Sequence, residues 1–230
     1  MLCHDSPTLE EVMPDLSAHE AIYSLRAMRR LKPNAVPEDD LRYIVDAATQ
    51  APSAANSQDW AFVVVTDPEP RRRLGEVYRA IGRKVIRDRV LASGELPHEA
   101  ERVYRRAMIL VEHLEEAPAL ILVALRGTPP TTAAEASAWF GSIYPAIQNL
   151  MLAARTRGLG TTLTTLHKIR DDDVKAILGI PDAFETIALI PVGYPQGSWG
   201  RPLRRPSSAV THWDRWKGRG PDASRRHDSG

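Results

Sequence analysis

Residues 51–66 read Ala-Pro-Ser-Ala-Ala-Asn-Ser-Gln-Asp-Trp-Ala-Phe-Val-Val-Val-Thr, and the expected fold is built outward from this stretch. Its second half, Trp60–Thr66, is a short apolar run rich in β-branched residues and bounded by turn formers, which predicts a buried strand. Upstream, acidic residues at 38–40 precede apolar residues at helical spacing: Leu41, Ile44, Val45 and Ala48. This pattern predicts a helix that ends at Ala51-Pro52. Residues 51–59 therefore join a helix to a strand.

Elsewhere helical and strand patterns alternate irregularly, which favours an α+β fold over a doubly wound α/β fold. Ala119–Leu125 and Ile187–Tyr194 predict two more buried strands, and Gly160–Leu166 predicts an extended segment. Apolar periodicity and end signals predict further helices at 17–31, 74–81, 103–114, 133–157 and 171–178. The first begins with a Ser17-x-x-Glu20 capping box. The helix over 133–157 is apolar around much of its circumference, which predicts the long core helix. Residues 82–98 are polar and are expected to be mobile or variable.

The length of 230 residues and the 43% hydrophobic content indicate one large globular domain with extensions. We expect an N-terminal extension at 1–16, a folded domain at 17–216 and a disordered Gly-, Ser- and Arg-rich tail at 217–230. No internal repeat is found.

The charge balance and the cysteine count exclude several classes of protein. Lys and Arg number 30 against 29 Asp and Glu, so nothing suggests a nucleic-acid or membrane-surface binder. The apolar runs are much shorter than the about 20 residues that a membrane helix needs. The N-terminus lacks the pattern of a secretory signal. Cys3 alone cannot form an internal disulfide or hold a cluster. We therefore expect a cytoplasmic protein with no nucleic-acid or membrane partner.

Three segments could carry chemistry. In Arg26-Ala27-Met28-Arg29-Arg30, a helical spacing would put Arg26 and Arg29 on one face, where paired guanidinium groups suit a phosphate. The alternative is a solvated basic helix end. In residues 51–60, Ser53, Asn56 and Gln58 could bond the polar edges of a flat ligand, unless this is an ordinary loop. Residues 193–206 place arginines on a Gly- and Pro-rich turn, either as a phosphate clamp or as a basic surface loop.

Other chemistries lack their motifs. The chain shows no His-x-x-x-His pair for a metal, no Gly-x-Ser-x-Gly elbow and no phosphate-binding P-loop. A Rossmann Gly-x-Gly-x-x-Gly is also missing, because Gly158-Leu159-Gly160 lacks the third glycine and follows a helix.

Taken in order, these segments resemble the FMN-dependent nitroreductase family. The resemblance covers about residues 17–216, and its most specific piece is the string Pro52-Ser53-x-x-Asn56-x-Gln58-x-Trp60. The other pieces follow the family order: Arg26-x-x-Arg29, Leu152-Ala153-Ala154, Gly158-Leu159-Gly160-Thr161, Leu178-Gly179-Ile180-Pro181, Val192-Gly193-Tyr194-Pro195 and a late arginine pair.

The resemblance implies an interlocked α+β homodimer with a central mixed sheet surrounded by helices and two FMN sites at the subunit interface. It implies cofactor contacts by Arg26, Ala27, Arg29, Arg30, Pro52, Ser53, Asn56, Gln58, Thr164, Thr165, Leu166, Arg204 and Arg205. Arg26 and Arg29 would hold the phosphate or the N1/O2 edge of the flavin, and Arg205, with Arg204, would close on the phosphate. The loop at 52–56 would come from the opposite subunit, and the backbone of 164–166 would face the ring near N5.

The implied activity is an NADH- or NADPH-dependent reduction of nitroaromatics, quinones or similar electron-poor acceptors by a ping-pong mechanism. The flavin N5 carries the chemistry, so no catalytic side chain is required. Four alternatives stay open: a flavin-storing or sensing protein, a dehalogenating branch, a flavin-fragmenting branch, and an interaction module without cofactor. A dehalogenase would use residues 82–116 as a substrate lid, with Tyr104, Arg102, Arg105 and Arg106 as contacts, unless this is a solvated helix. The flavin-fragmenting branch has an acid where this chain has Ala27, which argues against it.

Overall fold

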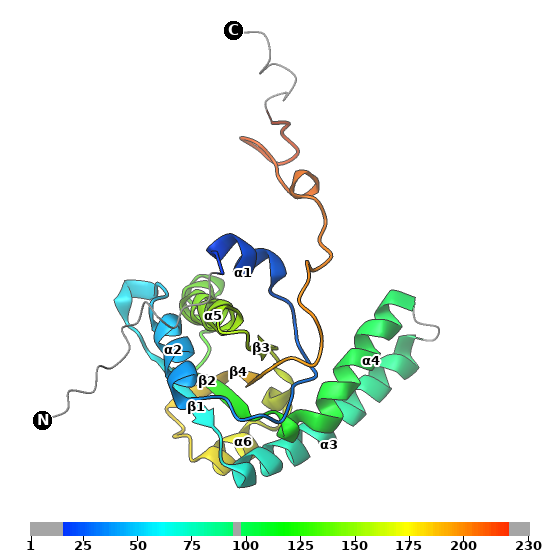
Figure 1. Ribbon diagram of the computed structural model, residues 1–230. Helices are drawn as coiled ribbons and strands as arrows, with labels where there is room; N and C mark the ends of the chain where they lie inside the picture. The colour runs from blue at the N-terminus through cyan, green and yellow to red at the C-terminus, as the bar shows by residue number, and fades with distance from the viewer. Residues whose placement is uncertain (1–15, 94–97, 221–230) are drawn as a thin grey trace, which may run out of the picture.

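The structure is a computed structural model that describes residues 16–93 and 98–220. A four-stranded sheet lies at its centre, with strand order β1-β2-β4-β3 (Figure 1). The strands are β1 (Trp60–Val65), β2 (Ala119–Arg126), β3 (Gly160–Thr161) and β4 (Phe184–Gly193). All three buried strands predicted from apolar runs are present as strands. β1, however, is half-buried rather than buried, because it lies at the sheet edge and its Val64 faces solvent.

Helices cover both faces of the sheet (Figure 1). They are α1 (Ala18–Ser24), α2 (Glu38–Thr49), α3 (Pro68–Ser93), α4 (His98–His113), α5 (Ala133–Thr156) and α6 (Asp171–Leu178). Short 3-10 turns are η2 (Ala54–Asn56), η3 (Leu114–Glu116), η4 (Leu166–Arg170) and η5 (Ser207–Ala209). The capping box is present, since Ser17 Oγ accepts from Glu20 N at 3.1 Å. Within the described residues no helix is long and apolar enough to cross a membrane.

The alternation of side chains along β2 divides the interior into two cores. Ile121 and Val123 belong to a core shared with α2 and α5, whereas Leu120 and Leu122 belong to a core shared with α3, α4 and α6. This is the period of two that a strand imposes. A strand buried on both faces reads as a continuous apolar run, which is why β2 was predictable.

The sheet corrects one expectation of the resemblance, that of mixed strand directions. Every strand pair among the described residues is antiparallel. The physical reason lies in the connections: Val65 at the end of β1 pairs with Leu120 at the start of β2, so the α3–α4 excursion leaves and re-enters the sheet at one end. A parallel pair would need a crossover to the opposite end.

The segment 82–98, expected to be mobile or variable, is helical where the structure describes it. α3 continues to Ser93 and packs against α4. Two interactions compensate for the polar composition. A Cβ at Gly82 would lie 2.3 Å from Val111 Cγ2, so the glycine permits close helix contact, and Arg83 forms an ion pair with Glu112. Gly94 and Pro97 lie outside the described residues, as do 1–15 and 221–230 of the predicted extensions.

Candidate functional site

The arginine segment, residues 26–30, is extended rather than helical. α1 ends at Ser24, eight residues before Lys32, where the helix was predicted to stop. The backbone of Met28 instead pairs with the region of β3: its N–H donates to Thr161 O at 2.9 Å, and its O accepts from Thr162 Oγ1 at 2.8 Å. Gly160 makes room for this approach, because a Cβ there would lie 2.8 Å from Met28 Cβ. Long-range pairing thus overrides the local helical pattern.

The extended backbone directs the arginines to different places. Arg26 Nη2 donates to Ser198 O at 2.7 Å, toward the turn that precedes the C-terminal segment. Arg29 and Arg30 instead line a cavity of about 400 Å³ beside α4. The predicted pairing of Arg26 and Arg29 on one helix face is therefore wrong.

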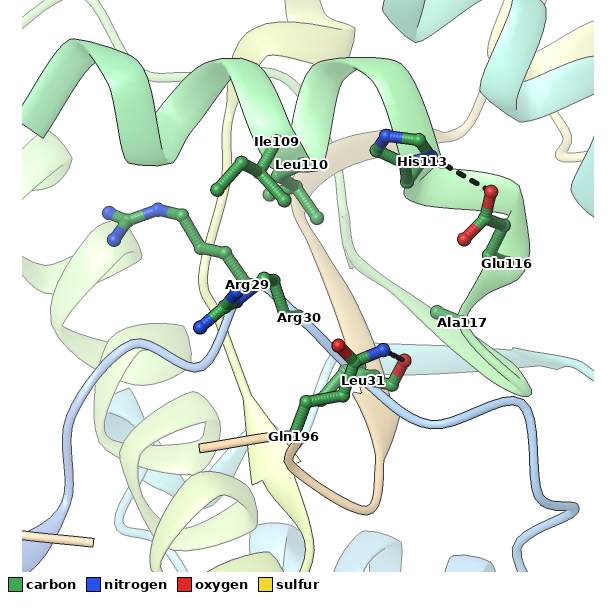
Figure 2. Close-up of a pocket in the computed structure, with 9 residues that line it drawn as sticks. All are labelled: Arg29, Arg30, Leu31, Ile109, Leu110, His113, Glu116, Ala117 and Gln196. Carbon is green, nitrogen blue, oxygen red and sulfur yellow. Dashed lines mark hydrogen bonds and ion pairs between the residues drawn. The ribbon is translucent and has the colours of Figure 1, made fainter. Parts of the chain in front are cut away.

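Figure 2 shows this cavity between the arginine segment and α4. Its lining residues are Arg29, Arg30, Leu31, Ile109, Leu110, His113, Glu116, Ala117 and Gln196. The polar side chains that line the cavity besides the two arginines already have hydrogen-bond partners. His113 Nδ1 lies 2.8 Å from Glu116 Oε1, and Gln196 Nε2 donates to Leu31 O at 2.9 Å. The guanidinium groups thus face a pocket with an apolar wall.

Arg29 is the half-buried cation of this cavity. Burial lowers the pKa of its guanidinium, the nearby Tyr78 opposes that shift, and Arg106 lowers the pKa further. No carboxylate among the residues of 16–93 and 98–220 acts on it. Burying a cation costs free energy when no counter-charge lies beside it. An anion or a polarised oxygen that binds next to Arg29 would offset this cost.

Tyr78 connects Arg29 to the predicted segment 164–166. Tyr78 is 2% exposed, and its hydroxyl lies 2.7 Å from Thr164 Oγ1. Burial raises the pKa of this phenol. Thr164 also forms two backbone hydrogen bonds with Leu189 of β4, at 2.9 and 3.1 Å. Thr164 therefore points inward, whereas Thr165 is exposed and Leu166 begins η4.

The loop at 52–58 is held well away from the arginine segment. Ala54 N donates to Ser142 Oγ at 2.9 Å, in the first half of α5. The arginine segment follows α1, which contacts α5 near Arg155. At 1.5 Å per helical residue, Ser142 and Arg155 are about 20 Å apart along α5.

Within this loop the residues bond mainly to one another. Gln58 N donates to Ser53 Oγ at 3.1 Å, and Gln58 Nε2 donates to Asn56 Oδ1 at 3.1 Å. Ala55, Asn56 and Gln58 have φ of 52°, 53° and 52°, a left-handed backbone that costs about 1 kcal/mol or more at a residue such as alanine. One chain does not bring this loop to the arginines, and Pro52 and Asn56 are exposed.

Arg204 and Arg205 are exposed on the segment after Gly200, which leads away from the rest of the described chain (Figure 1). Among the described residues, Arg204 Nη1 donates to its neighbour Leu203 O, at 3.0 Å. In a single chain the predicted site is thus divided among three places: the arginine segment with 164–166, the loop at 52–58, and the C-terminal arginines.

With this geometry established, a family model described as the nitroreductase family matches residues 22–194. The chain belongs to the nitroreductase family. It is 30% identical over 223 residues to the NADH dehydrogenase of Thermus thermophilus, covering 89% of this chain and 100% of that protein. It is 29% identical over 173 residues to the iodotyrosine deiodinase of Thermotoga neapolitana, covering 74% and 84%.

A solved structure of oxidised iodotyrosine deiodinase bound to FMN and 3-iodo-L-tyrosine superposes on this nitroreductase-family chain with a TM-score of 0.68. That comparison covers 86% of this chain and 99% of the other, at 22% identity, and so bears on the fold alone. The predicted nitroreductase-like α+β fold is confirmed.

Sequence reasoning missed two residues that lie beside the predicted site, Arg155 and Tyr78. Arg155, 7% exposed, donates from Nε to Ser24 Oγ at 2.9 Å and stacks on Trp199 at 4.2 Å, joining α1, α5 and the turn beside Arg26. The sequence did carry a signal for Arg155: it lies in the last turn of a helix that has no other charged residue after Glu135. Tyr78 was interpreted only as part of an apolar face, although a buried phenol needs a hydrogen-bond partner.

Proposed function

We propose that this chain is an FMN-dependent oxidoreductase that uses NADH or NADPH to reduce electron-poor acceptors such as nitroaromatics or quinones. The observation that carries the proposal is Arg29, a half-buried guanidinium facing a cavity with no carboxylate among the described residues acting on it. Family membership and the name of the Thermus relative support an oxidoreductase that uses a nicotinamide nucleotide.

The residues present fit FMN by the chemistry of their donors. A phosphate carries about two negative charges and is best held by several arginines. We assign the phosphate to Arg26, which already bonds the 198–200 turn, together with Arg204 and Arg205 further along the same segment. Arg29 would hold the N1/O2 edge of the ring, beside Ala27 and Arg30.

The ring would lie against residues 164–166. The Thr164 hydroxyl is bonded to the buried Tyr78 and points into the core. The exposed Thr165 and the adjacent backbone are therefore the groups able to face a ligand. Bound FMN would supply the redox chemistry by taking a hydride from NADH or NADPH and delivering two electrons to the acceptor. Arg29 would stabilise the negative charge at the N1/O2 edge, and the apolar wall of Leu31 and Leu110 would exclude water.

We further propose that the protein acts as a homodimer. The loop with Pro52, Ser53, Asn56 and Gln58 bonds α5 at Ser142, about 20 Å along the helix from Arg155, which bonds Ser24 just before the arginine segment, so we infer that it serves the site of a second chain. Its left-handed backbone is fixed by its own hydrogen bonds, which makes it a preformed surface for the flavin of a second copy.

Reductive removal of a halogen from an aromatic ring is a second candidate. The Thermotoga relative carries the name of a deiodinase, and α4 forms one wall of the cavity, as a substrate cover would. Iodide release from an iodinated phenol, compared with reduction of a nitroaromatic under the same conditions, separates the two activities.

The experiment that tests the proposal is anaerobic titration of the purified protein, after incubation with FMN and desalting. We expect a visible flavin band that NADH or NADPH bleaches, and that menadione or nitrofurazone restores. A band that neither nucleotide bleaches would favour a storage or sensing role. Protein that retains no flavin would overturn the proposal.

A further inference from the structure

We propose that the cavity beside α4 binds the anionic group of the electron acceptor and that Arg106 is the residue that selects for it. This rests on the proposed function, because it names the acceptor class of that site: a small aromatic carboxylate or a comparable organic anion. Such a ligand combines an apolar ring with one negative charge.

The position of Arg106 follows from the periodicity of α4. Ile109, Leu110 and His113 line the cavity. Arg106 precedes them by three, four and seven residues, so it projects from the same face of the helix, one turn further from η3. The electrostatic effect of Arg106 on Arg29 agrees with this placement, since two cations interact only when they are near each other.

The charges around the cavity do not balance within the described part of the chain. Arg29 and Arg30 line the cavity, and Arg106 is near enough to Arg29 to lower its pKa, whereas the lining acid, Glu116, is paired with His113. Two other acids of α4 whose side chains the structure describes are engaged, because Glu101 pairs with Arg105 and Glu112 pairs with Arg83. An anion entering the cavity would therefore meet guanidinium groups, and the one lining carboxylate among the described residues, Glu116, is already bonded to His113.

The apolar lining and the size of the cavity fit the aromatic ring of the proposed ligand. Its apolar wall is formed by Leu31, Ile109, Leu110 and Ala117. Its volume of about 400 Å³ is within the range of small-molecule sites. The cofactor does not account for every cation here, because Arg26 bonds the 198–200 turn, where we place the phosphate, and Arg29 alone would offset the single negative charge of the reduced ring edge.

The test compares two acceptors that share a ring and differ in charge, para-nitrobenzoate and its methyl ester, with the FMN-loaded enzyme. For Arg106→Ala we expect kcat/KM for the carboxylate to fall about tenfold, through KM, while the value for the ester stays within about twofold. Arg106→Lys should keep part of the preference. The matched control is Arg105→Ala, which removes the same charge one residue away, where Arg105 pairs with Glu101. Arg105→Ala should leave the ratio of the two kcat/KM values, carboxylate to ester, unchanged.

A binding measurement removes the dependence on turnover. Calorimetry of benzoate against benzyl alcohol should show a preference for benzoate that Arg106→Ala reduces about tenfold, with FMN affinity unchanged. Equal effects on both ligands, or a loss in Arg105→Ala as large as in Arg106→Ala, would overturn the proposal. So would a loss of FMN affinity in Arg106→Ala, because the anion would then be the cofactor. If neither acceptor is reduced while Arg106-dependent benzoate binding persists, the proposed function fails and the anion site stands.

Discussion

Tyr78 shows how a residue outside the cavity wall can hold the candidate site in place. Its hydroxyl contacts Thr164 Oγ1 at 2.7 Å, and its ring is buried in the core shared by α3, α4 and α6. Tyr78→Phe removes this bond and should lower the free energy of unfolding by about 1 kcal/mol. Urea denaturation of the apo-protein measures it. In a double-mutant cycle with Thr164→Val, additive losses would contradict a direct bond.

His167 gives the protein an acid-sensitive element. It is 1% exposed, Nε2 lies 3.1 Å from Thr186 Oγ1, and burial lowers its pKa to about 4, against the opposing effect of Asp171. Because the unfolded side chain titrates near 6.5 and the folded one near 4, the unfolded state binds the proton first as the pH falls. Stability should therefore decline by up to about 3 kcal/mol between pH 6.5 and 4.

Denaturation curves across this pH range test the prediction. His167→Gln should remove the slope between pH 6.5 and 4, whatever its effect at neutral pH. Asp171 contributes in a lower window, because its lowered pKa makes its stabilising effect disappear only as the pH falls below its ordinary value. An unchanged slope in His167→Gln would show that other groups cause the acid sensitivity.

Arg205 belongs to the proposed phosphate end. Arg205→Ala should weaken FMN binding by about 1–3 kcal/mol, the contribution of one charged hydrogen-bond partner, and leave riboflavin binding unchanged because riboflavin lacks the phosphate. Fluorescence titration of both flavins gives the two affinities. Arg215→Ala, another exposed arginine of the same segment, is the control and should change neither. Equal weakening for both flavins would place Arg205 elsewhere.

The sequence identified which residue types would carry the chemistry but not where each points. The order of the arginine segment, the loop and the late arginines was enough to indicate the family. Whether Arg26 and Arg29 share a direction depends on Met28, whose backbone bonds to Thr161 and Thr162, more than 130 residues away. No local pattern encodes such a pairing. The roles of Arg29, Thr165 and Arg205 in cofactor binding remain predictions.

At the level of helices, the contact between α3 and α4 depends on a missing side chain. Gly82→Ala adds a methyl group where a Cβ would lie 2.3 Å from Val111 Cγ2. Overpacking should lower the free energy of unfolding by about 1–3 kcal/mol, whereas the better helix propensity of alanine raises it by up to about 1 kcal/mol. The variant should therefore be less stable by about 1 kcal/mol.

A compensating variant tests this explanation by thermal or chemical denaturation. Val111→Ala alone leaves a cavity, but in combination with Gly82→Ala the new methyl group can occupy part of it. The double variant should therefore lose less stability than the sum of the two single losses. Strict additivity would mean that the two residues do not meet.

Elements were predictable where local pattern and burial agree. β2 is apolar throughout because both of its faces are covered, and α2 carries its apolar stripe toward α5. The failures occur where distant contacts decide. The end of α1 is set by pairing with the β3 region, and the second half of α3 is held by Gly82 and the Arg83–Glu112 pair. Strand direction likewise depends on where a connection returns.

For the whole molecule, the proposed dimer is the property to test. α5 presents an exposed Tyr144, 41% accessible, in a stretch without charge from 136 to 154. We expect this face to contact a second copy. Tyr144→Glu should shift the protein from dimer to monomer in light scattering, and it should release FMN, because the loop of the second copy would be lost.

Ile169→Glu is the control, since Ile169 is 58% exposed on η4, an element that packs on α3, α6 and β4. It should stay dimeric and keep its flavin. A wild-type protein that is monomeric and fully loaded with flavin would contradict both the dimer and the role of residues 52–58.

The register between β1 and β2 has a consequence for how relatives can diverge. Because Val65 and Leu120 are paired neighbours, the pairing of β1 with β2 is complete at the end of the sheet where the chain leaves for α3 and returns through η3. The outer turns of the α3–α4 arm can then be lengthened, shortened or exchanged without shifting a single strand pair. Since α4 also walls the cavity, a change in the length of this one arm would alter which molecules are accepted and leave the framework beneath it intact.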